Sequence, residues 1–538
     1  MTNPNPIFEQ AFEKHQAGDI GTAAKLYRTV LEKDPGHSDA MHMLGIIAQQ
    51  TKKPELALDL MDRALAQNPN MAMAWCNRCI VLRVLGRRDE ALQSAKKALA
   101  VDPHIADGWD LAGSILREMG QYEESCAHHK RAVELQPGNV RFQSNYTALL
   151  LAVGDLHKAY QSARTSEQID KEFIPLPLGN VLQAAGYPER AIPHFRKSYE
   201  ILPHFHEARL NEAMALLQIG DFEKGWELWE TRPDDKALFQ HIPRWQGEKI
   251  SHLLIHEDQG MGDALQLVRY IPLIRERADK ITLQLTGHLH ELMASNFPNI
   301  DVLTLDDPVP KANARIQLMS LPYLLKTRLE TIPASVPYLK ADQNLRKIWQ
   351  EKISKIKSPR IGIVWAGNAH NRNDLNRSID FLKVRPLLEK YGAHCISLQK
   401  GRPEEQKELQ ALHIFDADPE LKNFSDTAAL LAELDLVITV DTAAAHLAGA
   451  MGVPVWLLLP FEPEWRWMHG RSDSPWYPSM RIFRQTAPRD WPALIARVLA
   501  ELQKWIDEND DAVLKAEAWP HSPLRQNPHA LKLEECDE

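Results

Sequence analysis

The chain has 538 residues, which is enough for two or three domains of ordinary size. Hydrophobic residues make up 44% of it and charged residues 25%, and no stretch holds the roughly 20 consecutive apolar residues that a membrane-spanning helix needs. The net charge of −9 argues against a general nucleic-acid-binding protein, because such proteins neutralise phosphates with an excess of lysine and arginine.

The first residues show neither a basic start nor an apolar segment of the signal-peptide type, so we expect a cytoplasmic protein. Peripheral membrane contact stays open. The five cysteines are too few and too scattered for a disulfide framework. Cys76 and Cys79 form a C-x-x-C pair, but no second ligand pair stands near them, so we favour packing over metal or redox use.

Four prolines recur every 34 residues in the settings EKDP, AQNP, AVDP and ELQP: Pro35, Pro69, Pro103 and Pro137. Twelve positions before each one stands a small residue that lets two helices approach closely: Ala23, Ala57, Ala91 and Ser125. This period is that of the tetratricopeptide repeat, in which a helix–turn–helix unit ends at a proline. We predict about seven units over residues 4–235, the last of them a junction, near 4–37, 38–71, 72–105, 106–139, 140–171, 172–205 and 206–235.

One such hairpin cannot bury its own apolar face, so neighbouring hairpins stack into a solenoid with a concave groove. A groove of this kind suits a protein or peptide partner. The alternative is that the array is a rigid spacer or a dimer surface.

The hydrophobic period changes after about residue 245. Short apolar runs separated by segments of helical spacing predict a Rossmann-type lobe over residues 245–340 and a second one, with a closing helix, over 358–506. The expected strands are 251–256, 281–285, 301–305 and 314–319, then 361–365, 394–398, 436–440 and 453–459. The expected helices are 264–274, 288–295 and 345–357, then 381–391, 427–434, 443–451 and 491–506. A polar tail follows at 507–538. Paired lobes of this kind bind ligands in the cleft at the carboxyl ends of their strands.

The first candidate site follows the first strand of the first lobe. His256 to Asp263 form a turn in which Gly260 and Gly262 let backbone N–H groups approach a ligand closely. A carboxylate there, such as that of Asp263, can accept the proton of an attacking hydroxyl. The alternative is that the acidic residues of this turn are helix caps or solvated charges.

The second candidate site is the Asp441-Thr442 pair at the end of a buried strand, followed at once by a helix rich in small residues that includes His446. Free N–H groups at a helix start favour an anion, and a phosphate needs further cationic partners. Residues that follow other strand ends of this lobe are candidate donor-binding residues: Arg377, Ser378, Gln399 and Lys400. The alternative is an ordinary helix cap with His446 as a packed helix residue.

These two motifs, Gly260-Met-Gly-Asp263 and Asp441-Thr-Ala-Ala-Ala-His446, resemble those of glycosyltransferase family 9, the ADP-heptose:lipopolysaccharide heptosyltransferases. The resemblance extends over about residues 250–500 and implies a GT-B-like pair of lobes behind a tetratricopeptide solenoid. By the family's motifs, Asp263 is the catalytic base, and Asp441, Thr442 and Ala443 bind the donor sugar and its diphosphate. Alanine replaces the family's glycine at position 443. The family's donor-lobe lysine has no secure match, and Arg377 and Lys400 are the candidates to replace it.

We therefore expect a glycosyltransferase that uses a nucleotide-sugar as substrate, inverts the sugar configuration and needs neither metal nor cofactor. Asp416-Ala-Asp418 matches the D-x-D pattern of metal-dependent transferases, but such triplets arise often by chance. Trp465, Trp467, Trp476 and Tyr477 are candidates either for stacking on a sugar or base or for packing between lobes. The alternative function is a non-catalytic scaffold with a degenerate transferase-like domain, and a dinucleotide-dependent oxidoreductase is disfavoured because the G-x-G-x-x-G turn is incomplete.

Overall fold

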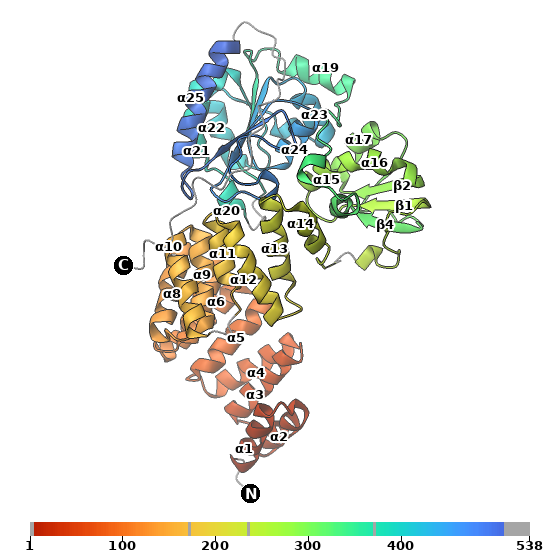
Figure 1. Ribbon diagram of the computed structural model, residues 1–538. Coiled ribbons are helices and arrows are strands. Elements are labelled where there is room, and N and C mark those ends of the chain that lie inside the picture. Colours follow the sequence, from red (N-terminus) through yellow and green to blue (C-terminus); the bar gives the residue numbers. More distant parts are fainter. Residues whose placement is uncertain (1–4, 171–173, 234–236, 369–372, 510–538) are drawn as a thin grey trace. The chain divides into compact units, whose positions relative to one another are not determined.

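The computed structural model describes residues 5–170, 174–233, 237–368 and 373–509 (Figure 1). The chain divides into two compact units, of which one ends at Val181 and the other begins at Leu182. The polar tail predicted for 507–538 lies outside the described residues except for 507–509, which end the last helix.

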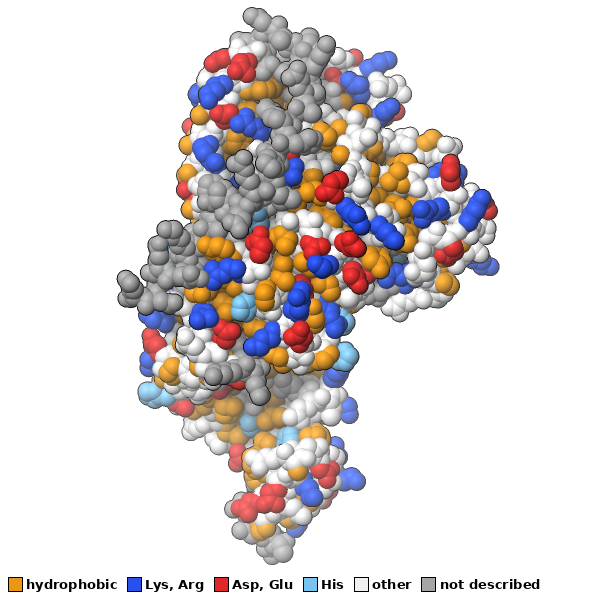
Figure 2. All heavy atoms as spheres, viewed as in Figure 1, with side chains coloured by type: hydrophobic (Ala, Val, Ile, Leu, Met, Phe, Trp, Pro, Cys, Tyr) orange, Lys and Arg blue, Asp and Glu red, His pale blue; other side chains and the backbone are white. Residues whose placement is uncertain are grey.

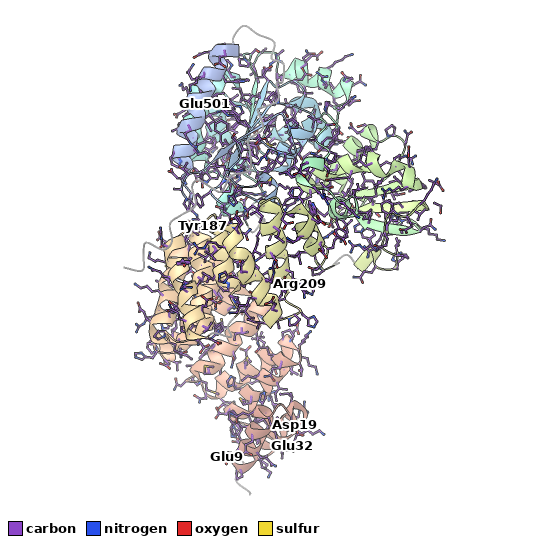
Figure 3. All side chains as sticks on the ribbon, in the orientation of Figure 1. Glu9, Asp19, Glu32, Tyr187, Arg209 and Glu501 are labelled. Carbon is purple, nitrogen blue, oxygen red and sulfur yellow. The ribbon has the colours of Figure 1, made fainter. Side chains whose placement is uncertain are left out.

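The first unit is built of antiparallel helical hairpins in which α1 packs on α2, α3 on α4, and so on to α9 and α10. Its helices are α1 (Asn5–Gln16), α2 (Ile20–Lys33), α3 (Ser38–Gln50), α4 (Pro54–Gln67), α5 (Ala72–Val84), α6 (Arg88–Val101), α7 (Ala106–Glu118), α8 (Tyr122–Leu135), α9 (Val140–Val153) and α10 (Leu156–Ile169). Asp19, labelled in Figure 3, caps α2 by accepting a hydrogen bond from the Thr22 N–H at 3.1 Å. Helix α11 (Leu176–Ala184) spans the unit boundary.

The 34-residue register is visible in the side chains. The four small residues that precede the prolines by 12 positions are all fully buried: Ala23, Ala57, Ala91 and Ser125. In two successive units a tryptophan indole donates to the carbonyl of the register proline, Trp75 to Pro69 and Trp109 to Pro103, both at 2.9 Å. The period in the sequence therefore corresponds to one repeated packing arrangement.

A residue of positive φ ends the first helix of each hairpin. Six of these residues are glycines, and the equivalent residue of the second hairpin is a lysine: Gly18, Lys52, Gly86, Gly120, Gly154, Gly186 and Gly220. Glycine suits this left-handed conformation because it has no Cβ to collide with the backbone. Lys52, with a φ of 57°, is the exception.

The Cys76 and Cys79 thiols lie on α5 and are buried in the helical core. Burial raises the pKa of each thiol to about 12. Both cysteines therefore act as packing residues in the repeat array.

The second unit begins with α12 (Pro188–Ile201), α13 (His206–Gln218) and α14 (Phe222–Trp229). The sequence places these helices in one repeat domain that ends at residue 235, whereas the compact units divide at Leu182. The physical reason is a shared apolar core, in which Leu217, Trp226 and Trp229 pack with residues of both α/β lobes.

The first lobe has a parallel sheet of order β3-β2-β1-β4. Its strands are β1 (Ile250–His256), β2 (Ala278–Leu285), β3 (Asp301–Thr304) and β4 (Ala314–Gln317). Its helices are α15 (Met261–Leu267), α16 (Ile271–Ile274), α17 (Gly287–Asn296) and α18 (Leu321–Leu324), and α19 (Gln343–Lys352) follows before the second lobe. The helix expected over 264–274 is thus broken, and α15 is only seven residues long.

The second lobe has a six-stranded parallel sheet of order β10-β9-β8-β5-β6-β7. The strands are β5 (Ile361–Val364), β6 (Cys395–Ser397), β7 (Phe415–Asp416), β8 (Leu436–Val440), β9 (Val455–Leu459) and β10 (Met480–Arg484). The helices are α20 (Asp374–Arg377), α21 (Phe381–Tyr391), α22 (Gln406–Ala411), α23 (Phe424–Leu431), α24 (Ala443–Ala450) and α25 (Trp491–Asn509). Helices α21 and α25 cover one face of the sheet, and α23 and α24 the other (Figure 1). The sequence predictions omit β7 and β10.

Basic and acidic side chains are interspersed on the face shown in Figure 2. This distribution agrees with a composition of 63 lysines and arginines against 72 aspartates and glutamates.

Candidate functional site

Each lobe has a point where the strand order reverses, and this is where open parallel sheets form a ligand crevice. In the second lobe it lies between β5 and β8, because the chain runs from β5 outward to β6 and β7 and then returns to β8 on the other side. Asp441 and Thr442 follow β8 at this point, and Ala443 begins α24. All three are partly exposed, so the start of α24 is accessible to a ligand.

Arg377 lies beside Asp441 at this crevice. Its guanidinium donates to the Asp441 backbone carbonyl at 3.0 Å and is held by Asp374 at 3.3 Å. It also packs against the backbone of Gly367, in the loop after β5. Arg377 therefore contacts the chain just after β5 and just after β8, the two strands that flank the crevice.

Ser378 and Gln399 brace the loop after β5. The Ser378 hydroxyl accepts from the Gly367 N–H at 2.9 Å and donates to Asp374 at 2.7 Å. The buried Gln399 side-chain oxygen accepts from the N–H groups of Trp365 and Ala366 at 3.1 and 2.8 Å. Both side chains shape the crevice through the backbone around it.

Lys400 follows β6 and is held near β7, at the edge of the sheet and away from the crevice between β5 and β8. Its ammonium pairs with Asp418 at 2.5 Å and donates to the carbonyls of Asp418 and Leu421 at 2.8 and 2.9 Å. The Asp418 carboxylate of the D-x-D triplet is also bound by the backbone, since it accepts a hydrogen bond from the Gly401 N–H at 3.0 Å. Of the two cations predicted from the sequence, the structure brings Arg377 to Asp441.

Asp263 meets the second lobe through Arg466. One Asp263 oxygen accepts from the Gly260 N–H at 2.8 Å, which caps α15, and the other forms an ion pair with the Arg466 guanidinium. Arg466 lies in the 3-10 helix η9 (Trp465–Trp467), 203 residues further along the chain. The Asp263 side chain keeps 22% exposure and that of Arg466 only 8%.

Two further carboxyl groups surround this ion pair. Burial raises the pKa of Asp441, while the Trp467 indole and the Arg466 and Arg377 guanidinium groups oppose that rise. Burial also raises the pKa of Glu464 to about 8, although Arg466 donates a hydrogen bond to it. These side chains retain 18% and 30% exposure, so solvent still reaches the site.

Gly262 of α15 lies against His446 of α24. A Cβ built on Gly262 would stand 2.8 Å from His446 Cδ2, so α15 packs directly on α24. His446 is buried, its Nδ1 shares a hydrogen bond of 2.9 Å with the Tyr477 hydroxyl, and its ring stacks on Trp467. Burial lowers its pKa well below the usual value. The structure thus buries His446 between α15 and α24, with its Nε2 3.9 Å from Asp441 Oδ1.

The aromatic side chains near the site are buried and pack against each other. Trp465 lies edge-on to Trp226 of α14, with ring centroids 5.2 Å apart, and carries the Arg466 guanidinium over its face at 4.2 Å. Trp467, Trp476 and Tyr477 are fully buried. Of the two roles considered from the sequence, the structure shows packing.

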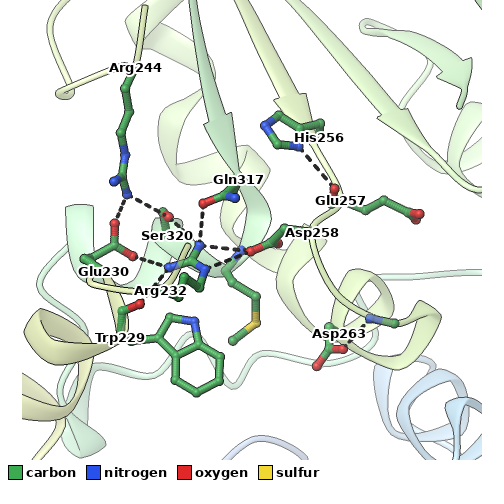
Figure 4. A network of polar contacts seen from close by, with 12 residues as sticks. Trp229, Glu230, Arg232, Arg244, His256, Glu257, Asp258, Asp263, Gln317 and Ser320 are labelled. Carbon is green, nitrogen blue, oxygen red and sulfur yellow. Dashed lines mark hydrogen bonds and ion pairs between the residues drawn. The ribbon is translucent and has the colours of Figure 1, made fainter. Parts of the chain in front are cut away.

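The crevice of the first lobe, between β1 and β4, is filled by the chain itself (Figure 4). Arg232, which follows α14, donates to Asp258 at 2.9 Å, to Gln317 at 2.7 Å and to Ser320 at 2.8 Å. Its side chain is 6% exposed and that of Asp258 is 4% exposed. Burial raises the pKa of Asp258, and Arg232 opposes that rise. This arginine fixes the junction after α14 to the first lobe.

Comparisons with known proteins agree with this architecture. Residues 14–76 and 106–139 match models of the tetratricopeptide repeat, and residues 400–467 match the model of glycosyltransferase family 9 (heptosyltransferase). The chain carries tetratricopeptide repeats, and part of its second lobe is similar to glycosyltransferase family 9.

A curated relative, protein FlbA of Caulobacter vibrioides, is 27% identical over 527 residues, covering 92% of this chain and 83% of FlbA. Among solved structures, Pseudomonas aeruginosa pilF shares 20% identity over 38% of this chain and 95% of its own, with a TM-score of 0.35. A tetratricopeptide repeat protein from Parabacteroides merdae shares 15% identity over 44% of this chain and 96% of its own, with a TM-score of 0.37.

The family 9 match contains Asp441, Thr442, His446 and Arg466, whereas Arg377 and Asp263 lie outside it. Arg466 and Glu464 are site residues that the sequence reasoning missed. A signal was present, because an arginine between two tryptophans directly after Pro463-Glu464 is an unusual place for a charge.

Among the described residues, no group of three or more histidine, cysteine, aspartate or glutamate side chains is arranged to hold a metal ion. Within the same residues, no helix has both the length and the apolar character needed to cross a membrane.

Proposed function

We propose that the two α/β lobes transfer a sugar from a nucleotide-sugar donor to an acceptor hydroxyl, with inversion and without a metal. The observation that carries this proposal is the packing of α15, which carries Asp263, on α24, which begins two residues after Asp441. The family 9 match supports the same conclusion.

In this mechanism the Asp263 carboxylate accepts the proton of the acceptor hydroxyl, whose oxygen forms a new bond to the sugar C1. The bond from C1 to the donor diphosphate breaks, and its electron pair leaves on the diphosphate oxygen. Arg377 and the free N–H groups at the start of α24 stabilise that charge. Asp441 and Thr442 contact the donor sugar in this proposal.

The repeat array binds a protein or peptide in this proposal, either the acceptor itself or a protein that carries it. Stacked hairpins supply an extended surface for such a partner.

The test is turnover of a panel of nucleotide-sugars by the full chain, measured as release of the nucleoside diphosphate. Asp263→Asn should lower the rate by about 10²- to 10⁴-fold, because the general base is lost. Asp301→Asn is the matched control, since it makes the same change at an exposed position of the same lobe, 57% exposed, and should keep full activity.

If no member of the panel binds or turns over, the non-catalytic scaffold replaces this proposal. A thermal-shift series with the same ligands reports binding independently of turnover, because a ligand that binds only the folded state raises the unfolding midpoint.

A further inference from the structure

Asp263 has no free carboxylate oxygen in this structure. One oxygen accepts from the Gly260 N–H at 2.8 Å, and the other is paired with the Arg466 guanidinium. Each oxygen keeps a second lone pair, but the Arg466 guanidinium competes with an acceptor hydroxyl for the oxygen that it holds. Asp263 is therefore more accessible to an acceptor hydroxyl when one of its two partners leaves.

Gly260 cannot leave easily, because its N–H bond is the cap of α15. Arg466 is different, since its guanidinium has several partners. Its Nε donates to the Gln266 side chain at 2.6 Å, one terminal nitrogen donates to Glu464, and the other faces Asp263. The guanidinium plane is also held over the Trp465 ring at 4.2 Å. The bond to Asp263 is thus one of several, and Gln266, Glu464 and Trp465 keep the guanidinium near the site when that bond is exchanged.

The same guanidinium acts on Asp441 at the crevice of the second lobe, where it opposes the rise in the pKa of that carboxyl. The chain beside Arg466 also reaches the donor site, because Trp467 stacks on His446, whose Nε2 lies 3.9 Å from Asp441 Oδ1. Arg377, at 3.0 Å from the Asp441 carbonyl, is the second cation at this position.

We propose that Arg466 is shared between Asp263 and the donor diphosphate: it holds Asp263 while the donor site is empty and turns to the diphosphate when the donor binds. This inference rests on the proposed function and adds a binding residue and an order of events to it. A diphosphate carries more negative charge than one carboxylate and offers the planar fork of arginine two acceptor oxygens, so it competes well with Asp263 for the guanidinium. Asp263 is then relieved of its competing partner when a donor is present.

The experiment titrates inorganic pyrophosphate into the full chain and into three variants, with the dissociation constant measured by calorimetry. Arg466→Gln should weaken binding by about 10- to 100-fold, because a charged hydrogen-bond donor is lost. Asp263→Asn should strengthen binding by about 3- to 10-fold, because removing a competitor enlarges the fraction of molecules in which Arg466 is available.

Glu433→Gln is the matched control. It removes the carboxylate partner of Arg346, a 2.8 Å ion pair of the second unit that lies outside the site, and should leave the dissociation constant unchanged. Arg466→Lys serves if Arg466→Gln does not fold, and it should also weaken binding, because an ammonium lacks the planar fork.

The opposite signs of the two site variants decide the inference, because a purely structural ion pair would weaken binding when either partner is lost. Weaker or unchanged binding by Asp263→Asn overturns the sharing of Arg466 and leaves the donor site standing. If the unaltered chain binds neither pyrophosphate nor any nucleoside diphosphate, the donor site itself is wrong, and the proposed function fails with this inference.

Discussion

Glu464 accepts a hydrogen bond from Arg466, but its surroundings disfavour a negative charge on its carboxyl group. Burial raises its pKa from a usual 4.5 to about 8. The folded protein therefore holds this proton more tightly than the unfolded chain does, and the contribution to stability is lost as the pH rises through about 8. Glu464 is thus a site residue whose charge changes near neutral pH.

Glu464→Gln should make the unfolding midpoint less dependent on pH between 5 and 9 than it is in the unaltered chain. The reason is that an amide carries no proton to lose. Thermal unfolding at a series of pH values measures this. Glu501→Gln is the control, because hydrogen bonds from Arg481 and Lys504 lower the pKa of Glu501 instead of raising it. This variant should therefore change the pH dependence of the unfolding midpoint only at acidic pH. Parallel curves for Glu464→Gln and the unaltered chain would contradict the assignment.

Lys52 is the one non-glycine residue at the left-handed turn position that Gly86 and Gly120 occupy in the next two hairpins. Holding a residue other than glycine in this conformation costs about 1–2 kcal/mol in the folded state. Replacement by glycine removes that cost, but part of the gain is lost because glycine is more flexible in the unfolded chain. Lys52→Gly should therefore raise the free energy of unfolding by about 0.5–1 kcal/mol. Gly86→Lys is the reciprocal change and should lower it. Urea unfolding tests both, and a destabilised Lys52→Gly would show that the lysine side chain stabilises the turn by other contacts.

At the level of elements, α15 and α24 meet through glycine. The sequence suggested that Gly260 and Gly262 let a ligand approach the backbone, but the structure places His446 against Gly262. The His446 ring cannot move away freely, because Trp467 and Tyr477 pack against it. Gly262 therefore sets the distance between the two helices that carry the site.

Gly262→Ala should lower the free energy of unfolding by about 1–3 kcal/mol, the usual effect of overpacking a well-filled contact. Gly260→Ala is the matched control, since its Cβ would meet only Asp263 Oδ2, at 3.4 Å, and its φ is −84°. Chemical denaturation of both variants measures the difference. Equal stability of the two would mean that the helices separate at no cost.

Elements with a strong sequence period were predicted well, and long-range contacts were not. The 34-residue register located the hairpins, and β8 and α21 begin and end at the predicted residues. Strand β7 has only two residues, too few for a pattern. Arg466 reaches Asp263 across 203 residues, and nothing local in the sequence specifies such a pair. The sequence also could not decide between Arg377 and Lys400 as the cation beside the start of α24, because the choice depends on how the loops after β5 and β6 fold.

At the scale of the whole molecule, the last hairpin belongs to the α/β unit. Helices α13 and α14 share an apolar core with both lobes, and α13 contacts η9, the segment that carries Arg466. The buried Gln218 side chain donates to the Pro463 carbonyl at 3.1 Å, just before Glu464. Helix α13 thus helps to position the residue that holds Asp263.

Gln218→Leu should therefore have two effects. Leaving the buried Pro463 carbonyl without its donor lowers the free energy of unfolding by about 1–3 kcal/mol. Displacing the segment before Arg466 also weakens pyrophosphate binding. Gln143→Leu is the matched control, because Gln143 is another buried glutamine that donates to a proline carbonyl, Pro137 at 3.3 Å, within the first unit. It should lower stability without changing pyrophosphate binding. If both variants bind pyrophosphate as the unaltered chain does, α13 supports the fold alone and has no part in positioning Arg466.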